Sequence, residues 1–368
     1  MDAKGGTLTK LGGLTWIALT LVIVTGCPPA PTPPPVAGPP TPVLQTCDHN
    51  STGNDFISAK VFLLSPAFDP KSGAAPSPSE IIRHVLPTDP YWNDLIAAFN
   101  TSPDFFKDKL CSLDGIFVVQ NTCAPAGCTA DDVIDHSWGF RQQISPPKRY
   151  IATSAALWQN GSAPVFTAYK NLRLQAVMAR LHPNGGNWFN RPGSQRLQFT
   201  SASPDTAAMT VLAVLAHETG HVFWFDAFVN PPGGSFNASN FCGGKFYARA
   251  VWPNVAVPSR RWVDFGEQLP NQLRNPDYVG ILQSHLSRTN YRQAGGGLRS
   301  IFQDTEAAGT LATFSSVEDF VEAYEWHVLL SAKPPLTDLT IQIPGYPPYD
   351  IVRGIANKPG LRRKMTCF

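Results

Sequence analysis

A five-residue motif at positions 217–221, His-Glu-Thr-Gly-His, constrains the fold of this chain more than any other feature. Residues four apart lie one turn above each other on a helix, so His217 and His221 can present two imidazole nitrogens to one metal ion. Glu218 then lies beside the ion, where a carboxylate can act as a general base. Imidazole and carboxylate ligands suit tetrahedral zinc, which leaves one position open for water. The motif therefore predicts a zinc site on a helix.

The sequence before the motif has the pattern of a helix that continues into it. Ser-Pro-Asp at residues 203–205 is typical of a helix start, and we expect Ser203 or Asp205 to cap the helix. An apolar run follows, with Ala207, Ala208, Met209, Val211, Leu212, Val214 and Leu215. In a chain of this composition, an accidental match to the motif has a probability of roughly 0.3%. The remaining alternative is a buried histidine pair with a purely structural role.

Two histidines do not complete a zinc site, so a third protein ligand has to come from elsewhere in the chain. In the metzincins, one group of zinc enzymes, the motif continues as HExxHxxGxxH, and the third histidine of this longer motif is the missing ligand. Here Trp224 stands where the glycine is required and Ala227 where the histidine is required. The sequence therefore argues against a metzincin and for a carboxylate ligand elsewhere.

Residues 315–330 contain a cluster of glutamates and have the pattern of a helix. Ser315 opens this helix with Glu318 at the capping-box position, and Glu318, Glu322 and Glu325 share one face. Such a cluster is usually a solvated acidic face. The many apolar residues of this segment leave little of the helix for solvent, so we expect at least one glutamate to be buried and either paired or bound to metal. Glu318 is the predicted ligand.

The two predicted helices resemble the gluzincin site of anthrax lethal factor and of the related Pro-Pro endopeptidases. The HETGH motif carries this resemblance together with the sequence EDFVEAY that begins at Glu318, which is similar to the EFFAEAF-like helix that completes the family's zinc site. The resemblance covers only these two helices. It implies three zinc ligands, which are His217, His221 and Glu318. It also implies Glu218 as the base and Glu322 as an outer-shell carboxylate.

The chain departs from this family at one position. The family has a tyrosine about two turns before the third ligand, where it assists the transition state, whereas this chain has Leu311. A donor for the developing oxyanion therefore has to come from another residue. The candidates between the two helices are His285, Tyr278, Tyr291 and Tyr247.

These parts predict hydrolysis of peptide bonds by a zinc-activated water, with a protein or peptide as substrate. Zinc lowers the pKa of water bound to it and polarises a carbonyl group, and Glu218 accepts the proton. Two alternatives remain open. One is a surface protein whose zinc site is structural or serves binding without catalysis. The other is a zinc amidase that acts on a non-protein substrate.

The N-terminus predicts export and a lipid anchor. Two lysines precede an apolar stretch at residues 14–24 that is too short to span a membrane. The sequence VTGC that ends at Cys27 resembles a bacterial lipobox, in which the chain is cut before the cysteine and the cysteine is lipidated. We therefore expect residues 1–26 to be a lipoprotein signal peptide and the protein to be anchored in the bacterial cell envelope, at the outer membrane or cell surface. Ordinary secretion and a single-pass anchor are the alternatives.

Residues 27–46 are rich in proline and predict an extended tether, because such a sequence adopts polyproline II and forms no helix or sheet. Residues 47–368 then form the zinc metallopeptidase domain, with a possible subregion at 47–150. The chain can bury a substantial core, since 43% of it is hydrophobic and 15% is charged. Its formal net charge of +2 gives no case for nucleic-acid binding.

Six cysteines follow Cys27, namely Cys47, Cys111, Cys123, Cys128, Cys242 and Cys367. An even number is typical of an exported protein with disulfide bonds. Fifteen pairings are possible, and the sequence selects none of them. A metal site at Cys123 and Cys128 is the weaker alternative in an oxidising compartment.

Hydrophobic and turn patterns predict an α+β, zincin-like fold. We expect short helices to start at residues 88–90 and 102–104, and strands at 116–120, 138–142 and 149–153. This small sheet and the helix that carries the motif would form an upper lobe. The lower lobe would be mainly helical and contain the glutamate-rich helix.

Two further segments lie on either side of the motif. Residues 164–182 predict a long amphipathic helix. Its expected inner side consists of Val165, Tyr169, Leu172, Ala176 and Ala179. Residues 228–314 have many glycines, prolines and asparagines and predict a loop-rich segment that lines the cleft, with one helix near 276–288.

Overall fold

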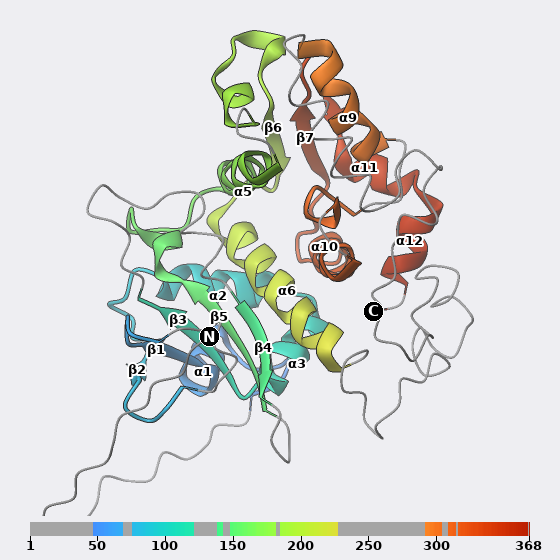
Figure 1. The fold of residues 1–368 in the computed structure, drawn as a ribbon. Helices are drawn as coiled ribbons and strands as arrows, with labels where there is room; N and C mark the ends of the chain where they lie inside the picture. Colours follow the sequence, from blue (N-terminus) through green and yellow to red (C-terminus); the bar gives the residue numbers. More distant parts are fainter. Residues whose placement is uncertain are drawn as a thin grey trace, which may run out of the picture. The chain divides into compact units, whose positions relative to one another are not determined.

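The computed structural model describes most of the chain beyond the predicted tether. The described residues are 47–68, 76–120, 138–142, 148–181, 185–226, 291–303, 308–313, 316–366 and 368. They form a mixed α+β fold with two small sheets, which confirms the α+β part of the predicted fold class (Figure 1). The predicted signal peptide, Cys27, the tether and the helix expected near residues 276–288 lie outside the described residues. Within the described part, no helix has the length and hydrophobicity needed to cross a membrane.

The first sheet has five strands in the order β2-β1-β3-β5-β4. Its parallel centre consists of β1 (Val61–Leu64), β3 (Gly115–Val119) and β5 (Lys148–Ser154). Strands β2 (Ile81–His84) and β4 (Trp138–Gln142) run antiparallel along its two edges. The three strands predicted from the sequence are β3, β4 and β5, and each is confirmed to within one residue at both ends.

The centre of this sheet is buried on both faces, which is usual for parallel strands. Every residue of β3 is buried. Ile116 and Val118 pack into the main hydrophobic core, whereas Phe117 and Val119 join Phe68 in a smaller cluster on the opposite face. The continuous apolar sequence of this strand therefore reflects its central position.

Three short helices pack into the main core: α1 (Gly53–Lys60), α2 (Trp92–Thr101) and α3 (Asp104–Ser112). The predicted start at residues 102–104 is confirmed, because α3 begins directly after Pro103. The predicted start at residues 88–90 is slightly early, since α2 begins at Trp92. Asp89 instead accepts two hydrogen bonds from the Arg83 guanidinium, at 2.6 and 2.7 Å.

The motif lies near the end of α6 (Ala207–Trp224), and the apolar residues before it are buried as expected. The predicted cap is wrong, because the side chain of Thr206 caps α6 by accepting a hydrogen bond from the Met209 amide at 3.2 Å. Asp205 has a different partner. Its carboxylate accepts hydrogen bonds from the amide and hydroxyl groups of Thr167, at 2.8 and 2.7 Å, in the first turn of α5 (Phe166–Leu181).

Helix α5 is present where the sequence predicts it, but its buried face differs from the predicted one. Val165 just before it is 45% exposed and Ala179 is exposed, whereas both were expected to face inward. Tyr169 and Ala176 are buried as predicted, and the buried face also contains Lys170 and Arg173. These two cations are buried because carboxylates of another helix meet them there.

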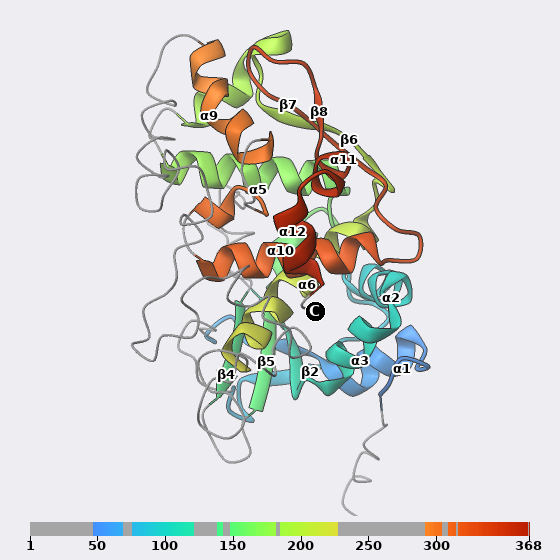
Figure 2. The same cartoon turned by 90° about the vertical axis from the view of Figure 1, so that its right-hand side faces the viewer.

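A second sheet joins segments that are far apart in the sequence. It consists of β6 (Gln198–Ser203), β7 (Asp338–Gln342) and β8 (Tyr349–Asp350), all antiparallel and in that order. Strand β6 leads into α6, and α10 (Ser316–Leu330) leads towards β7, so the pairing of β6 with β7 brings the two helices together. Figures 1 and 2 show α6 between the five-stranded sheet and α10.

Three further helices of the described residues lie in the C-terminal part of the chain. They are α9 (Tyr291–Gln303), α11 (Ile351–Ala356) and α12 (Pro359–Met365). Helix α11 contacts the second sheet, and α12 contacts α10. Short 3-10 helices are formed by Ala155–Trp158, Gly185–Asn190, Gly193–Gln195 and Leu311–Thr313. The helix predicted at residues 315–330 is confirmed as α10, although its predicted first residue, Ser315, lies outside the described residues.

Cys47 and Cys111 lie at disulfide distance, with Cα atoms 5.2 Å apart. The pair links the first described residue to α3. It agrees with the expectation that cysteines beyond Cys27 form disulfide bonds. The other four cysteines of the set lie outside the described residues.

Helix α12 is fixed to α10 by a buried ion pair. The Lys364 ammonium donates a hydrogen bond to the Asp319 carboxylate at 2.7 Å, and both side chains are 1% exposed. Asp319 also accepts a hydrogen bond from the Ala308 amide at 2.8 Å. The first turn of α10, which contains Glu318, is thereby held from two sides.

Lys364→Met should lower the free energy of unfolding by about 3–5 kcal/mol, because it leaves the buried Asp319 carboxylate without its counter-ion. Urea denaturation followed by circular dichroism measures this change. Lys333→Met is the matched control, since Lys333 pairs with Asp104 at 2.8 Å but both side chains are more than half exposed. The control should keep the wild-type midpoint. Equal midpoints for the two variants would contradict the assigned role of Lys364.

Candidate metal centre

Helices α6 and α10 approach each other closely at Gly220, inside the motif. A Cβ atom at this position would lie 3.2 Å from the Val321 Cγ1 atom and 3.3 Å from its Cα atom. A larger residue would therefore push α10 away. Glu318 lies almost one turn before Val321, so this close contact brings its carboxylate against the histidines of α6.

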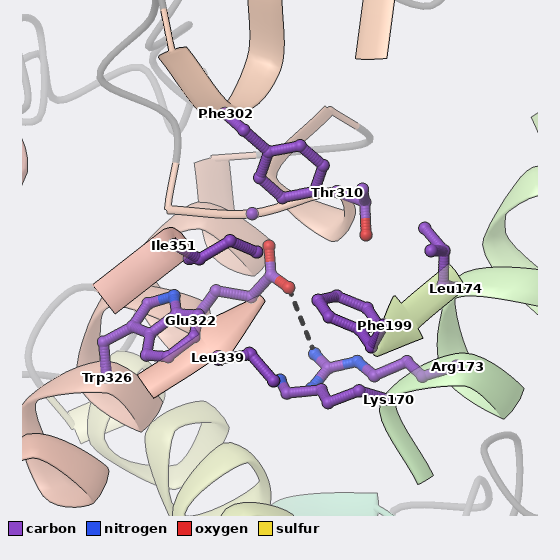
Figure 3. A pocket seen from close by; sticks show the side chains of 11 residues that line it. Lys170, Arg173, Leu174, Phe199, Phe302, Thr310, Glu322, Trp326, Leu339 and Ile351 are labelled. Atoms are coloured by element: carbon purple, nitrogen blue, oxygen red, sulfur yellow. Dashed lines mark hydrogen bonds and ion pairs between the residues drawn. The ribbon is translucent and has the colours of Figure 1, made fainter. Parts of the chain in front are cut away.

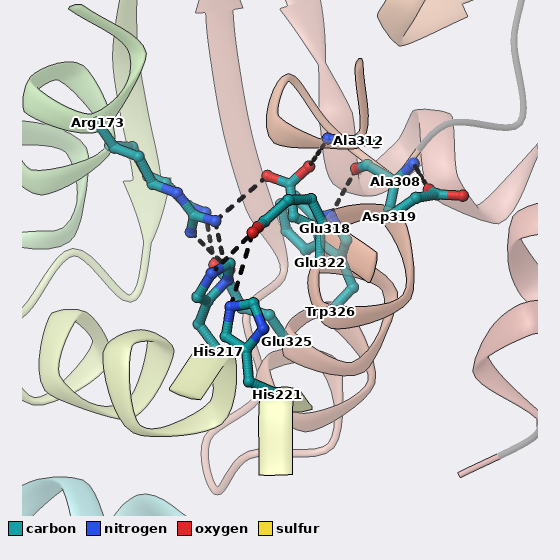
Figure 4. A network of polar contacts seen from close by, with 11 residues as sticks. Arg173, His217, His221, Ala308, Ala312, Glu318, Asp319, Glu322, Glu325 and Trp326 are labelled. Carbon is teal, nitrogen blue, oxygen red and sulfur yellow. Dashed lines mark hydrogen bonds and ion pairs between the residues drawn. The ribbon is translucent and has the colours of Figure 1, made fainter. Parts of the chain in front are cut away.

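The three predicted ligands converge on one point. The Glu318 Oε2 atom is 3.5 Å from His217 Nε2, and Glu318 Oε1 is 3.7 Å from His221 Nε2. One donor atom from each residue lies within 4.8 Å of the other two. Atoms about 2.0–2.2 Å from a tetrahedral zinc ion lie about 3.3–3.6 Å apart, so small shifts bring this set to zinc geometry. The group can hold a metal ion (Figure 4).

The candidate ligands are partly open to solvent. The exposed fractions of their side chains are 11% for His217, 20% for His221 and 25% for Glu318. A metal held there would keep one side accessible to water or to a substrate. A purely structural zinc site is normally closed by a fourth protein ligand, and within the described residues only these three form such a group.

Glu218 lies between the two histidines in the sequence and is buried against the edge of the first sheet. The Gly139 amide of β4 donates a hydrogen bond to its carboxylate. The backbones are so close that a Cβ atom on Gly139 would lie 2.0 Å from the Glu218 carbonyl oxygen. Burial raises the pKa of Glu218 to about 7, and the charge of His217 opposes this shift. A carboxyl group that titrates near neutral pH is suited to act as a general base.

The three candidate ligands titrate differently in the protein without metal. Burial lowers the pKa of His221 to about 4. Burial also works against an ionised Glu318, but the charges of the two histidines and the hydrogen bond with His217 outweigh it and lower its pKa to about 2. For His217, burial and the nearby Arg173 charge favour the neutral ring. Its hydrogen bonds with Glu318 and Glu325 outweigh both and raise its pKa to about 9.

Arg173 of α5 reaches the side of His217 that faces away from Glu318, a contact that the sequence did not predict. Its Nη2 atom lies 2.9 Å from His217 Nδ1, and its Nη1 atom donates to Glu325 Oε2 at 2.6 Å. Lys170 donates to the other oxygen of Glu325, also at 2.6 Å. The only signal in the sequence is that Lys170 and Arg173 interrupt the inner face of an amphipathic helix, and nothing local identifies their partners.

Glu322, which the resemblance implies as an outer-shell carboxylate, reaches the ligands through Arg173. Its carboxylate accepts a hydrogen bond from the Ala312 amide at 2.9 Å and lies 3.5 Å from Arg173 Nη2. It lines a small cavity of about 20 Å³ together with Lys170, Arg173 and the aromatic rings of Phe199, Phe302 and Trp326 (Figure 3). The prediction that at least one glutamate of α10 is buried and paired is confirmed by both Glu322 and Glu325.

The expected oxyanion donor is not identified within the described residues. Leu311, at the position of the family's tyrosine, is buried in the 3-10 helix before α10. His285, Tyr278 and Tyr247 lie outside the described residues, and so does the side chain of Tyr291.

Comparison with known proteins adds no relative. No protein-family model, no curated protein and no solved structure matches the chain. A functional assignment therefore depends on the chemistry of the residues themselves. The strongest feature in that respect is the group formed by His217, His221 and Glu318 with Glu218 beside it.

Zinc affinity should fall as the pH falls from about 8 to about 5, by about tenfold or more per pH unit, because binding displaces a proton. The pKa of about 9 for His217 means that its ring holds this proton throughout the range. Glu218, with a pKa of about 7, adds to the release of protons on zinc binding near neutral pH. Protons compete with zinc for His221 and Glu318 only at lower pH. Titration against a chromophoric chelator at several pH values measures the slope, and a flat profile would contradict a protonated His217.

Proposed function

We propose that this chain is an exported zinc metallopeptidase that is tethered to a membrane by lipid on Cys27. The observation that carries the proposal is the convergence of His217, His221 and Glu318, which come from two helices far apart in the sequence, with a buried carboxylate next to them. In the zincin-like arrangement that we infer, the five-stranded sheet and α6 belong to an upper lobe and α10 belongs to a lower lobe.

The residues of the centre divide the reaction between them. His217, His221 and Glu318 would hold a zinc ion, which would supply a Lewis acid that lowers the pKa of water and polarises a carbonyl group. Glu218 accepts the proton of the attacking water and then transfers it to the departing amine. The Gly139 amide of β4 favours the ionised form of Glu218, which is the form that accepts a proton. No covalent intermediate with the protein is required.

Strand β4 supports a peptide substrate in particular. Within the described residues it pairs only with β5, so its other edge has no strand partner there. The same strand contacts Glu218 through Gly139. An extended peptide that adds to this edge would form main-chain hydrogen bonds beside the base. This way of docking requires a peptide backbone, which favours a peptidase over an amidase with a non-protein substrate.

One observation favours a second candidate function. Leu311 is apolar and buried at the position where the resemblance implies a tyrosine that assists the transition state. A zinc site without that donor also fits a surface lipoprotein that binds a partner through the metal and does not cleave it. Turnover of a peptide bond distinguishes the two functions.

Variants of the four central residues separate metal binding from catalysis. His217→Ala, His221→Ala and Glu318→Ala should lose zinc and activity together, since each removes a ligand. Glu218→Gln should keep zinc and lower turnover by about two to four orders of magnitude, because the proton acceptor is lost. The measurements are metal content by mass spectrometry and cleavage of a labelled unstructured protein. Zinc with no turnover in the wild type would favour the binding protein, and full zinc content in Glu318→Ala would move the third ligand elsewhere.

The lipid anchor is tested separately. Mass analysis of the mature protein, expressed with its N-terminus in a bacterial host, should find a lipidated Cys27 as the first residue. Cys27→Ala should abolish cleavage before this position and release the protein from the membrane fraction. Ser79→Ala is the control, because Ser79 is exposed and its replacement leaves the packing unchanged, whereas a change at the buried Ser154 would disturb it. An unlipidated mature N-terminus would contradict the anchor and leave the metal centre unaffected.

A further inference from the structure

Four charged side chains are buried together behind the metal centre. Lys170, Arg173, Glu322 and Glu325 are each at most 7% exposed, and their formal charges cancel. Burying ions is costly, and apolar residues of similar size are often as stabilising as a buried ion pair. Stability alone therefore does not explain why these ions are present. Their contacts with neighbouring side chains, His217 among them, indicate a further role.

Glu325 is held from both sides in one orientation. Lys170 Nζ donates to its Oε1 atom and Arg173 Nη1 donates to its Oε2 atom, each at 2.6 Å. Lys170 is itself fixed, because its ammonium group lies over the rings of Phe166 and Trp326 at 5.4 and 5.3 Å from their centroids. The Glu325 Oε2 atom then lies 3.4 Å from His217 Nδ1.

Helix α5 provides a rigid base for the two cations. The side chain of Asn171, which lies between them in the sequence, forms two hydrogen bonds with the backbone of Phe199 in β6. Its amide group donates to the Phe199 carbonyl at 2.9 Å, and its oxygen accepts from the Phe199 amide at 2.6 Å. The cations are therefore anchored to the strand that leads into α6, the helix that contains His217.

A proton on His217 Nδ1 needs a hydrogen-bond acceptor. His217 Nε2 faces Glu318, so it is the nitrogen available to a metal, and a neutral ring that binds metal there carries its proton on Nδ1. Arg173 has only donors and cannot accept that proton, so its Nη2 atom, which lies 2.9 Å from Nδ1, has to move away from a protonated Nδ1. The Glu325 Oε2 atom is the carboxylate oxygen within reach, whereas Glu322 is engaged by Arg173 and the Ala312 amide.

We propose that Glu325, oriented by Arg173 and Lys170, is the carboxylate that accepts the Nδ1 proton of His217 and so positions Nε2 for the metal. The assignment rests on the proposed metal centre and differs from the resemblance, which gives this outer-shell role to Glu322. It makes α5 a third helix of the metal centre. Glu325 and Arg173 are positioning residues, since they act on the metal through His217 (Figure 4).

Comparison of Glu325→Gln with Glu322→Gln tests the assignment, because both changes keep the size of a buried carboxylate on the same helix. Glu325→Gln should lower zinc affinity by about 10 to 100-fold, the usual effect of losing such a partner. It should also change the absorption spectrum of the cobalt-substituted protein, since His217 would be reoriented. Glu322→Gln removes the same charge but no contact with His217, so it should lower the affinity less than Glu325→Gln and keep the wild-type spectrum. An equal or larger loss of affinity in Glu322→Gln, or a changed spectrum in that variant, overturns the proposal.

A double variant separates positioning from general stability. Arg173→Met removes one buried positive charge and should lower both the denaturation midpoint and zinc affinity. Arg173→Met combined with Glu325→Gln removes one charge of each sign and leaves Lys170 to balance Glu322. The midpoint should recover towards the wild type while zinc affinity stays as low as in Glu325→Gln. Recovery of both quantities together would show that the network acts only on folding and would overturn the proposal.

Zinc affinity and the cobalt spectrum can both be measured without peptide cleavage. A wild type that binds zinc without cleaving peptides would refute the proposed peptidase activity and still allow the variants to be compared. A wild type that binds neither zinc nor cobalt would overturn both the metal centre and the role of Glu325.

Discussion

The packing of α6 against α10 is the interaction on which the rest of the site depends. Neither helix contains a complete set of ligands, and the chain between them is long. Two features hold them together: the contact of Gly220 with Val321, and the pairing of β6 with β7, which continues in the hydrogen bond from the Thr337 amide to the Ser203 carbonyl at 2.7 Å. Phe320 is fully buried in this contact against Phe223 and Trp224 of α6, and burial of such a side chain contributes about 1.5–3 kcal/mol. That burial offsets the cost of placing ions next to it.

Features that depend on local sequence were predictable. The helices α6 and α10 and the strands β3, β4 and β5 follow from hydrophobic periodicity and from turn residues at their ends. The ligand set followed from spacing on one helix and from a resemblance for the other. The cap of α6 shows the limit of a local pattern. Asp205 is a good capping residue, but Thr167 of another helix uses its carboxylate, and Thr206 takes the role.

Features that depend on distant partners were not predictable. Lys170 and Arg173 look like polar interruptions of an amphipathic face, because the carboxylates that compensate them lie about 150 positions further along the chain. Glu322 and Glu325 share one face of α10, so periodicity cannot decide which of them approaches His217. The rotation of α10 about its axis decides it, and the contact at Gly220 fixes that rotation. Strand β7 had a visible alternation, with Leu339 and Ile341 buried, but its partner is about 140 positions away.

The charges around the metal centre explain how an arginine can lie beside a cation site. A guanidinium 2.9 Å from a ligand nitrogen would repel a divalent ion if it were uncompensated. Here the two cations of α5 face two carboxylates of α10, so this buried group has no net charge. The negative charge available to a metal then comes from Glu318 on the partly exposed side. The fold thus separates a buried region, in which ions cancel and orient His217, from a partly exposed region, in which the Glu318 carboxylate can bind the metal.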